Sequence, residues 1–340
     1  MKRVIFMVLL SGLAFLALNR AVTLPAATLI NVGRLGTSAE LPIFIAIEKG
    51  YFKEAGIELK FSEFTASGPM VAPLATNQLQ VFSSGIGPGL YNAIARGMPI
   101  IIVSSSSRHL PGRSVEVLVV RSDLKEKIKR ASDLKGRKVA INAPGSVLIY
   151  SLGKALATEG LALKDVELVY MSFPDMVVAL KTKAIEVAYE VEPIATLAEA
   201  EGHGVKWKTT GDFVKDPSPD TAGVHFNKDW ARANPELAVN FLAAWLKGVR
   251  IYHEAVGRGI NREEMINIAI KYTRVKERWI YDKMNWAYIP PNGLVNVRSI
   301  EDQIDWYFRN GHITHRLTED QVVDNSYMEK VLKKLGEYKP

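Results

Sequence analysis

Short apolar runs and amphipathic stretches alternate along the first two thirds of the chain. Residues Thr28–Arg34 and Lys138–Ile141 are apolar runs typical of strands, and Ile57–Ser62 alternates apolar and polar side chains as a half-buried strand does. Amphipathic stretches between them predict helices, among them Pro42–Lys49 and Val147–Glu159. This rhythm predicts an α/β fold with largely parallel sheets. Further strands are predicted at Pro99–Val103, Val166–Met171, Ile185–Tyr189 and Val205–Trp207.

Beyond Lys228 the pattern becomes helical throughout. Apolar residues recur at helical spacing through Pro235–Ala255 and form one wide stripe. Three more helices are predicted at Asn261–Tyr272, Lys276–Ala287 and Ile300–Phe308. We expect these helices to pack on the first of two lobes.

Two segments about 105 residues apart resemble each other. Residues 71–97 and 178–202 share apolar positions, a proline and an Ala-rich helix in the same order, with a gap of one residue; the matches include Leu74 with Leu180, Val81 with Val187, Pro88 with Pro193 and Gly97 with Gly202. A chance alignment of Ala and Gly is the alternative. A single duplication at this spacing predicts two similar α/β lobes, with a ligand cleft between them.

The chain is expected to pass between the two lobes twice. Segments rich in Ser, Gly, Pro and Asp at Ser104–Ser114 and Gly211–Ala222 are the predicted crossovers, which can act together as a hinge. The predicted domains are a signal peptide at 1–27, a first lobe made of 28–107 and 220–340 with the C-terminal helices, and a second lobe at 108–219.

Composition and charge narrow the function. The chain has 340 residues, of which 48% are hydrophobic and 23% charged, as in a globular protein long enough for two domains. Its net charge of +7 is scattered and lacks interleaved aromatic residues, so nucleic acid is not an expected partner. Cysteine is absent, which excludes disulfides, thiol catalysis and a lipid-modified cysteine anchor.

The N-terminus has the pattern of an export signal. Lys2 and Arg3 precede an apolar run from Val4 to Leu18, and small residues follow at Ala26–Ala27. The run is short for a membrane span, although an uncleaved anchor is the alternative. Removing residues 1–27 takes away three basic residues and no acids, so the net charge falls from +7 to +4. We expect a soluble, monomeric protein in the periplasm.

Candidate binding groups lie where loops follow strands. Thr37 and Ser38 follow the first strand, and Gly145 and Ser146 follow the strand that begins the second lobe. Unpaired backbone N–H groups at helix N-termini favour an anionic or polar ligand group. The alternative is that Ser38 and Ser146 cap their own helices, and both roles can coexist.

The two repeats add further candidates at the predicted cleft. Ser83, Ser84 and Gly85 follow the strand of the first copy, and Glu190 and Glu192 follow that of the second. Either acid would suit a ligand amine or ring N–H, or it could be a solvated loop acid. Three arginines near the first loop and the crossover, Arg34, Arg108 and Arg113, are either anion clamps or surface residues. No catalytic set, metal site or cofactor motif is found, so no catalytic residue, metal or cofactor is expected.

Several motifs together resemble one known family. Residues 46–57, AIEKGYFKEAGI, and residues 133–140, DLKGRKVA, followed by Pro144-Gly145-Ser146, resemble the NMT1/THI5-like family of ABC-transporter substrate-binding proteins. This family includes nitrate-, taurine-, sulfonate- and thiamine-pyrimidine-binding proteins. The chain departs from the family's Gly-x-Ile-Asp at residues 77–80, NQLQ, and 183–186, KAIE, where a structural rather than chemical consequence is expected.

The resemblance implies a type 2 periplasmic binding protein fold, with two α/β lobes and a two-crossover hinge. It implies a non-enzymatic receptor that binds a small anionic or heteroaromatic solute and presents it to an ABC permease in the inner membrane. One alternative is an enzyme on the same fold, similar to thiamine-pyrimidine synthases, although their Cys-rich iron-binding motif is absent. The other alternative is the soluble sensor domain of a signalling protein.

Overall fold

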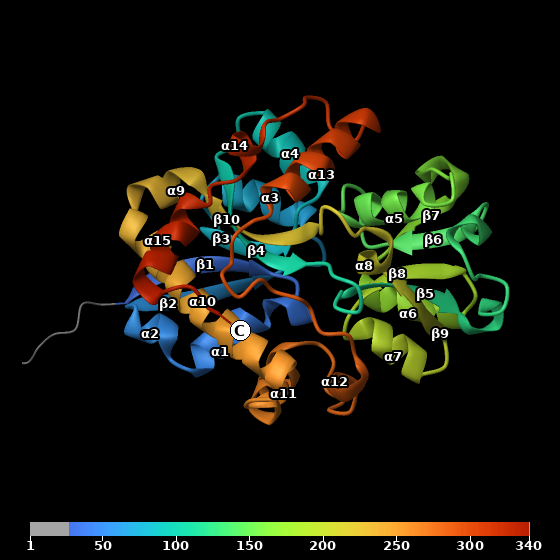
Figure 1. Cartoon of the computed structure of the whole chain (residues 1–340), viewed down its shortest axis with the longest axis horizontal. Helices are drawn as coiled ribbons and strands as arrows, with labels where there is room; N and C mark the ends of the chain where they lie inside the picture. Colours follow the sequence, from blue (N-terminus) through green and yellow to red (C-terminus); the bar gives the residue numbers. More distant parts are fainter. Residues whose placement is uncertain (1–26, 340) are drawn as a thin grey trace, which may run out of the picture.

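The computed structural model describes residues 27–339, which form two lobes, each built around a five-stranded mixed sheet. Figure 1 shows the larger lobe, which holds both the N-terminal strands and the C-terminal helices, beside the smaller lobe formed by the middle of the chain. The predicted export signal lies outside the described residues except for Ala27. In the described part, no helix combines the length and the apolar character that crossing a membrane requires.

The sheet of the larger lobe, lobe 1, contains both parallel and antiparallel strand pairs. Strand β1 pairs in parallel with β2 and β3, whereas β10 is antiparallel to β3 and β4. The strand order is β2 (Ile57–Glu63), β1 (Thr28–Arg34), β3 (Val81–Gly85), β10 (Asp220–Asn227) and β4 (Ile100–Arg108). Helices of this lobe include α1 (Leu41–Glu48), α2 (Tyr51–Glu54), α3 (Gly68–Ala75), α4 (Pro88–Ala95), α9 (Lys228–Ala233), α10 (Pro235–Arg258) and α11 (Arg262–Tyr272).

The sheet of the smaller lobe, lobe 2, repeats this arrangement. Strand β6 pairs in parallel with β7 and β8, whereas β5 is antiparallel to β8 and β9. The order is β7 (Glu167–Tyr170), β6 (Lys138–Ile141), β8 (Val187–Val191), β5 (Glu116–Arg121) and β9 (Gly204–Thr209). The helices are α5 (Leu148–Ala157), α6 (Phe173–Lys181), α7 (Ile194–Ala200) and α8 (Thr210–Phe213).

The antiparallel strands correct the expectation of largely parallel sheets. Strands β5 and β10 were not predicted from the sequence, and each is the strand that the chain enters after passing from one lobe to the other. A parallel neighbour requires a helical crossover on the same sheet, which a strand arriving from the other lobe does not have. The duplicated segments occupy equivalent places, because β3 and β8 are the central strands of their sheets.

The C-terminal third departs from its predicted helices at one place. A helix was expected over Lys276–Ala287, but only α12 (Ile280–Lys283) forms there. The following residues donate to and accept from distant partners instead: Asn285 N donates to Glu192 Oε1, and the carbonyl of Ala287 accepts from the Tyr252 hydroxyl. Three further helices complete the chain, namely α13 (Val297–Arg309), α14 (Glu319–Val322) and α15 (Ser326–Leu335).

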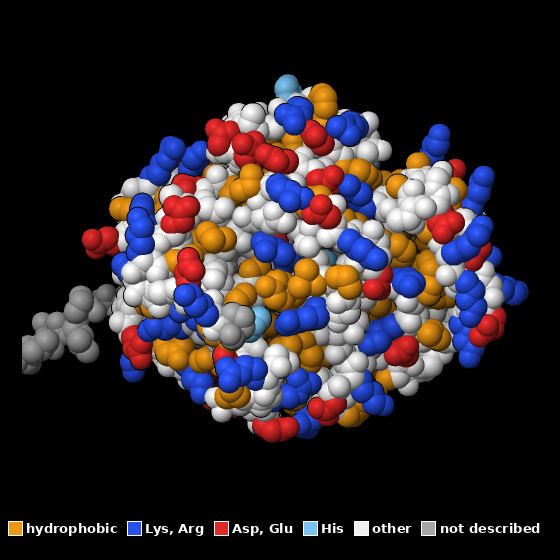
Figure 2. Space-filling model, in the orientation of Figure 1, with side chains coloured by type: hydrophobic (Ala, Val, Ile, Leu, Met, Phe, Trp, Pro, Cys, Tyr) orange, Lys and Arg blue, Asp and Glu red, His pale blue; other side chains and the backbone are white. Residues whose placement is uncertain are grey.

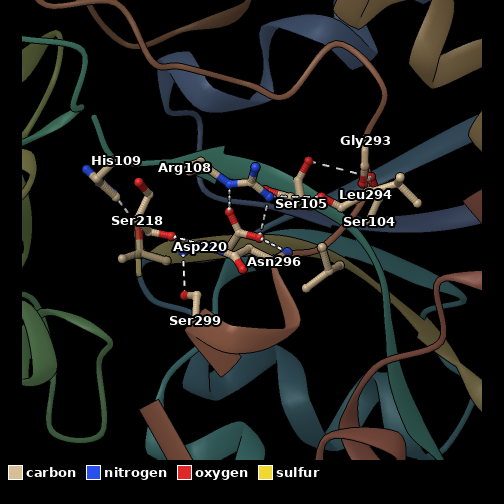
Figure 3. A network of polar contacts seen from close by, with 12 residues as sticks. Ser104, Ser105, Arg108, His109, Ser218, Asp220, Gly293, Leu294, Asn296 and Ser299 are labelled. Atoms are coloured by element: carbon tan, nitrogen blue, oxygen red, sulfur yellow. Dashed lines mark hydrogen bonds and ion pairs between the residues drawn. The ribbon is translucent and has the colours of Figure 1, made fainter. Parts of the chain in front are cut away.

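The strands run further into the hinge than the sequence indicated. Strand β4 extends to Arg108 and β10 begins at Asp220, so the crossovers between them and lobe 2 are shorter than predicted. Arg108 binds both carboxylate oxygens of the buried Asp220, at 2.7 and 3.1 Å, and also donates to the carbonyl of Leu294. Asp220 Oδ2 accepts from Asn296 N at 2.6 Å, and Asp220 N donates to Ser299 Oγ at 2.8 Å. Figure 3 shows how this network fixes both crossovers to the C-terminal segment.

The surface carries no block of one charge on the face that Figure 2 shows. Acidic and basic side chains are interspersed over both lobes there.

Candidate functional site

A cavity lies between the two sheets, lined by both lobes. It encloses about 630 Å³ of space free of protein atoms, part of it open to solvent. Lobe 1 contributes Leu35, Thr37, Ala39, Glu40, Ser67, Ser83, Ser84, Gly85, Ser106, Ser107, Thr221 and Ala222. Lobe 2 contributes Val115, Glu116, Asn142, Ser146, Val147, Leu148, Phe173, Val191 and Glu192. Its lining is a mixture of hydroxyls, carboxylates and apolar side chains, as expected for a small organic ligand.

Six of the nine residues expected at the cleft line this cavity. They are Thr37, Ser83, Ser84, Gly85, Ser146 and Glu192. Ser146 also has the alternative role considered above, because its Oγ accepts from Leu148 N at 3.2 Å at the start of α5. The structure thus brings together the end of strand β3 and three loops that are far apart in the sequence.

The other three expected residues lie beside the cavity. Ser38 is fully buried and donates to the carbonyl of Glu192 at 3.0 Å, so it neither lines the cavity nor caps a helix. Gly145 lies at the contact of the two lobes, where its carbonyl approaches Gly87. Glu190 is buried within lobe 2, where burial raises the pKa of its carboxyl well above the usual value. These positions were predicted from loop adjacency, which does not determine the direction of a side chain.

Glu40 shapes the first loop of the cavity and was not predicted from the sequence. Its carboxylate accepts from Leu35 N at 2.6 Å and from Gly36 N at 2.9 Å, and Gly36 has a φ of 77° that suits glycine. Burial raises the pKa of Glu40 to about 7, although these N–H groups and nearby Arg34 oppose the shift. The acid therefore fixes the loop that carries Thr37.

Glu116, at the start of β5, is the second unpredicted acid. Its Oε2 accepts from the hydroxyls of Ser151 at 2.8 Å and Thr210 at 2.7 Å, and its Oε1 lies 3.5 Å from His109 Nε2. Burial acts to raise its pKa, but the charge of nearby His109 and the hydrogen bonds from the two hydroxyls lower it to about 2. Glu116 is therefore ionised at neutral pH on the lobe 2 wall.

Several hydroxyls and one amide complete the polar lining. Ser67 Oγ and Ser84 Oγ form a hydrogen bond of 2.5 Å. Ser106 Oγ, Ser107 Oγ and Asn142 Oδ1 are buried, and none of them has a hydrogen-bond partner among the described residues. Buried polar atoms without partners are rare in folded proteins, so these three are available to a ligand or to water. The four consecutive serines at 104–107 are visible in the sequence, where they were interpreted as part of a crossover rather than as cavity residues.

Glu192 is a cavity residue that also joins the lobes. Its Oε2 accepts from Thr196 N at 3.1 Å and Thr196 Oγ1 at 2.7 Å, and its Oε1 accepts from Lys206 Nζ and Asn285 N, both at 3.1 Å. Asn285 belongs to the segment after α12, whereas the other partners belong to lobe 2. The alternative that Glu192 is a solvated loop acid is wrong, because the residue is fully buried.

The lobes are in contact along two further edges. A Cβ added to Gly87, before α4, would lie only 2.4 Å from the carbonyl oxygen of Gly145 in lobe 2. On helix α5, the hydroxyl of Tyr150 and Nζ of Lys154 bind the carboxylate of Asp302 on α13, at 2.5 and 2.8 Å. These contacts hold the two lobes in a closed arrangement around the cavity.

None of the three arginines considered as anion clamps lines the cavity. Arg34 donates to the carbonyl of Tyr272 and lies over the ring of Phe44, 4.6 Å from its centroid. Arg108 binds Asp220, and Arg113 lies over the ring of Tyr288. The expectation that they could clamp an anion in this cavity is therefore wrong, because none of the three is among the residues that line it.

Comparison with known proteins gives one family and several relatives. The family model described as "NMT1/THI5 like" matches residues 38–255. A putative aliphatic sulfonates-binding protein of Bacillus subtilis is 25% identical over 309 residues, covering 88% of this chain and 87% of the relative. The taurine-binding periplasmic protein of Escherichia coli is 29% identical over 235 residues, covering 68% of each chain.

A solved structure has the same fold. The alkanesulfonate-binding protein of Xanthomonas axonopodis pv. citri, bound to MOPS, superposes with a TM-score of 0.72 at 17% identity, covering 88% of this chain and 98% of the other. The expected type 2 periplasmic binding protein fold is therefore confirmed.

Proposed function

Because the chain belongs to the NMT1/THI5-like family, we propose that it is the solute-binding receptor of an ABC importer. The observation that carries the proposal is the cavity itself, which takes its lining from both lobes of a hinged fold. A ligand that contacts both walls stabilises the closed form more than the open form, and this difference is what shifts a hinge equilibrium. Relatives named as binding proteins for sulfonates and taurine support the same role.

In this proposal the protein binds its solute without converting it. The chain would be exported by the signal at residues 1–27, act as a monomer in the periplasm, and present the closed, loaded form to a permease in the inner membrane. With lobe 1 at 28–107 and 220–340 and lobe 2 at 108–219, both lobes would contribute to the surface that the permease contacts. A permease can then distinguish the closed form from the open one by the relative position of the two lobes.

The test is a thermal-unfolding screen of residues 28–340 with small organic anions, amines and nitrogen heterocycles. A ligand at about 100 times its dissociation constant adds about 2.7 kcal/mol to the free energy of unfolding, which raises the midpoint clearly. Mass spectrometry of the bound solute after prolonged incubation checks that it is recovered unchanged. A solute that is converted would contradict the receptor role and favour an enzyme, and loss of solute uptake on deletion of the gene would support import.

A further inference from the structure

We propose that the ligand of this cavity is neutral or cationic and presents N–H donors to an acidic wall, rather than being a free anion such as a sulfonate or nitrate. The inference rests on the proposed receptor function and narrows its ligand class. The cavity is lined by three carboxylates, Glu40, Glu116 and Glu192, and no Lys, Arg or His is among the described residues that line it. An anion would therefore meet carboxylate oxygens without a facing cation.

Each carboxylate has a cationic or basic partner that does not line the cavity. Arg34 lies 3.8 Å from Glu40, His109 3.5 Å from Glu116, and Lys206 3.1 Å from Glu192. These partners reduce the net charge of the wall, but the charged side chains that line the cavity are all acidic. Such a surface favours N–H donors and tolerates a single positive charge, because hydrogen bonds to an ionised acceptor are the strong ones.

Glu116 is the acid with acceptor capacity left for a ligand. Two hydroxyls occupy its Oε2, whereas its Oε1 is 3.5 Å from His109 Nε2, beyond an ordinary hydrogen bond. By contrast, Glu40 already accepts two backbone N–H groups on its two oxygens. Glu192 accepts on both of its oxygens as well. We therefore assign Glu116 as the residue that pairs with a ligand N–H.

The atoms without partners point to the same ligand chemistry. Asn142 Oδ1 is an acceptor only, and the unpartnered Ser106 and Ser107 hydroxyls can each accept as well as donate. The N–H group of Leu148, at the start of α5, already donates to Ser146 Oγ and is thus not free for an anion. Apolar lining from Val147, Leu148 and Phe173 suits a ring or a short alkyl body.

A cationic side chain that lines an adjoining cavity provides the control. An adjoining cavity shares Thr37, Phe173 and Glu192 with the first and is lined by Arg274. If the ligand were an anion, Arg274 is the side chain that would recognise it. Replacing Glu116 and Arg274 in turn therefore separates the two ligand classes.

The experiment measures the melting temperature of residues 28–340 with two sets of probes of matched size. Benzylamine, benzamidine and 4-aminopyrimidine supply N–H donors, and benzenesulfonate, benzoate and nitrate supply anions. We expect at least one donor probe to raise the melting temperature by several degrees and the anions to have no effect. Binding of the anions alone would overturn the inference while leaving the receptor role intact, whereas silence of both sets at millimolar concentration would count against both.

Two variants then test the assignment by calorimetric titration with the best donor probe. Glu116→Gln should weaken binding at least tenfold, because the amide loses the charge and offers one acceptor in place of two. Arg274→Gln should change the affinity less than threefold. The reverse order of effects would overturn the inference. Since the probe comparison uses the native chain, it decides the question even if Glu116→Gln does not fold.

Discussion

The two copies of the duplicated unit use the same scaffold to make opposite kinds of contact between the lobes. When the copies are aligned through Pro88 and Pro193, the residue before the proline is Gly87 in lobe 1 and Glu192 in lobe 2. Gly87 approaches Gly145 of lobe 2 because it has no side chain. Glu192 reaches Asn285 because it has a long one. The same turn therefore admits close approach in one copy and a polar link in the other.

The two copies differ in the side chains that they contribute to the ligand site. The central strands β3 and β8 each end at the cavity, which fixes where the two turns lie. Their chemistry then diverged: lobe 1 offers the hydroxyls of Ser83 and Ser84, and lobe 2 offers the carboxylate of Glu192. Four predictions test this comparison.

Removing the lobe 2 carboxylate should have the largest effect. In Glu192→Ala the ammonium of Lys206, whose side chain is 16% exposed, loses its partner, as do the N–H groups of Thr196 and Asn285. Breaking one side of a largely buried ion pair lowers the free energy of unfolding by about 4 kcal/mol. Urea unfolding measures this loss, and Glu192→Gln, which retains one carbonyl acceptor, should lose about half as much. A loss below about 1 kcal/mol for Glu192→Ala would show that the polar link does not stabilise the closed form.

The acids of the two lobes should respond to pH in opposite directions. The pKa of Glu40 in lobe 1 is raised to about 7 by burial, and that of Glu116 in lobe 2 is lowered to about 2. A raised folded pKa stabilises the protein fully below the unfolded value of about 4.5, and this contribution is lost as pH rises through 7. A lowered folded pKa stabilises it above 4.5, and that contribution is lost as pH falls towards 2.

The variant Glu40→Gln isolates the contribution of Glu40 to the pH dependence of stability. Between pH 4.5 and 7.5 the free energy of unfolding of the native chain should fall by about 3 kcal/mol relative to the variant, because the pKa of Glu40 is about 7 in the folded state and 4.5 in the unfolded chain. Urea unfolding at a series of pH values, with the variant as reference, gives the difference directly. Parallel curves for the two proteins over this range would mean that Glu40 has an ordinary pKa in the folded state.

Adding one methyl group to the lobe 1 turn should open the closed form. In Gly87→Ala the new Cβ would lie 2.4 Å from Gly145 O and 2.9 Å from Val147 N, whereas the φ of −100° is accessible to alanine. The substitution should therefore leave the folding of lobe 1 unchanged and hinder its contact with lobe 2. Ligand affinity should fall by about 10- to 100-fold, or about 1.4–2.8 kcal/mol.

Gly89→Ala is the matched control for that variant. Its nearest contact across the lobes would be Gly145 O at 3.8 Å, an ordinary van der Waals distance. Titration with a ligand found in the screen should give unchanged affinity for this control. Equal losses in both variants would assign the effect to helix α4 rather than to lobe closure.

The sequence predicted the fold better than it predicted the site. Strands at Thr28–Arg34 and Lys138–Ile141 have the predicted bounds, because local apolar runs determine them. The predicted helix over Lys276–Ala287 was wrong at its end because contacts from Glu192 and Tyr252 hold Asn285 and Ala287 out of helical form. Local periodicity contains no signal for partners that are about 35 to 90 residues away.

Two site residues were not predicted from the sequence for the same reason. Glu116 and Asn142 lie on or after strands that the cleft brings together, and neither has a neighbouring motif that marks it. Their roles follow from partners such as His109 and from the absence of one at Asn142 Oδ1, which only the folded chain shows. The departures from Gly-x-Ile-Asp, by contrast, could be interpreted correctly from the sequence, since both have a structural consequence.

The departures at these two turns lead to the prediction with the smallest expected change in the free energy of unfolding. Asn77 and Lys183 occupy the glycine position in the two copies and have φ values of 61° and 64°. Gln80 and Glu186 occupy the acid position, and each accepts a backbone N–H at 2.9 Å, from Asn31 and Lys138 respectively. The turn is therefore retained in both copies with residues that are less suited to it than glycine.

Restoring the glycine should stabilise the lobe 2 copy more than the lobe 1 copy. Lys183→Gly removes the left-handed strain of a long side chain and should add about 0.5–1 kcal/mol to the free energy of unfolding. Asn77→Gly should add less, because asparagine tolerates this conformation and Asn77 Oδ1 accepts from Gln80 Nε2 at 3.1 Å. Lys183→Ala keeps the strain and serves as control in the same urea titration. If alanine stabilised the chain as much as glycine, the gain would come from removing the lysine charge, and the turn conformation would not explain the departure.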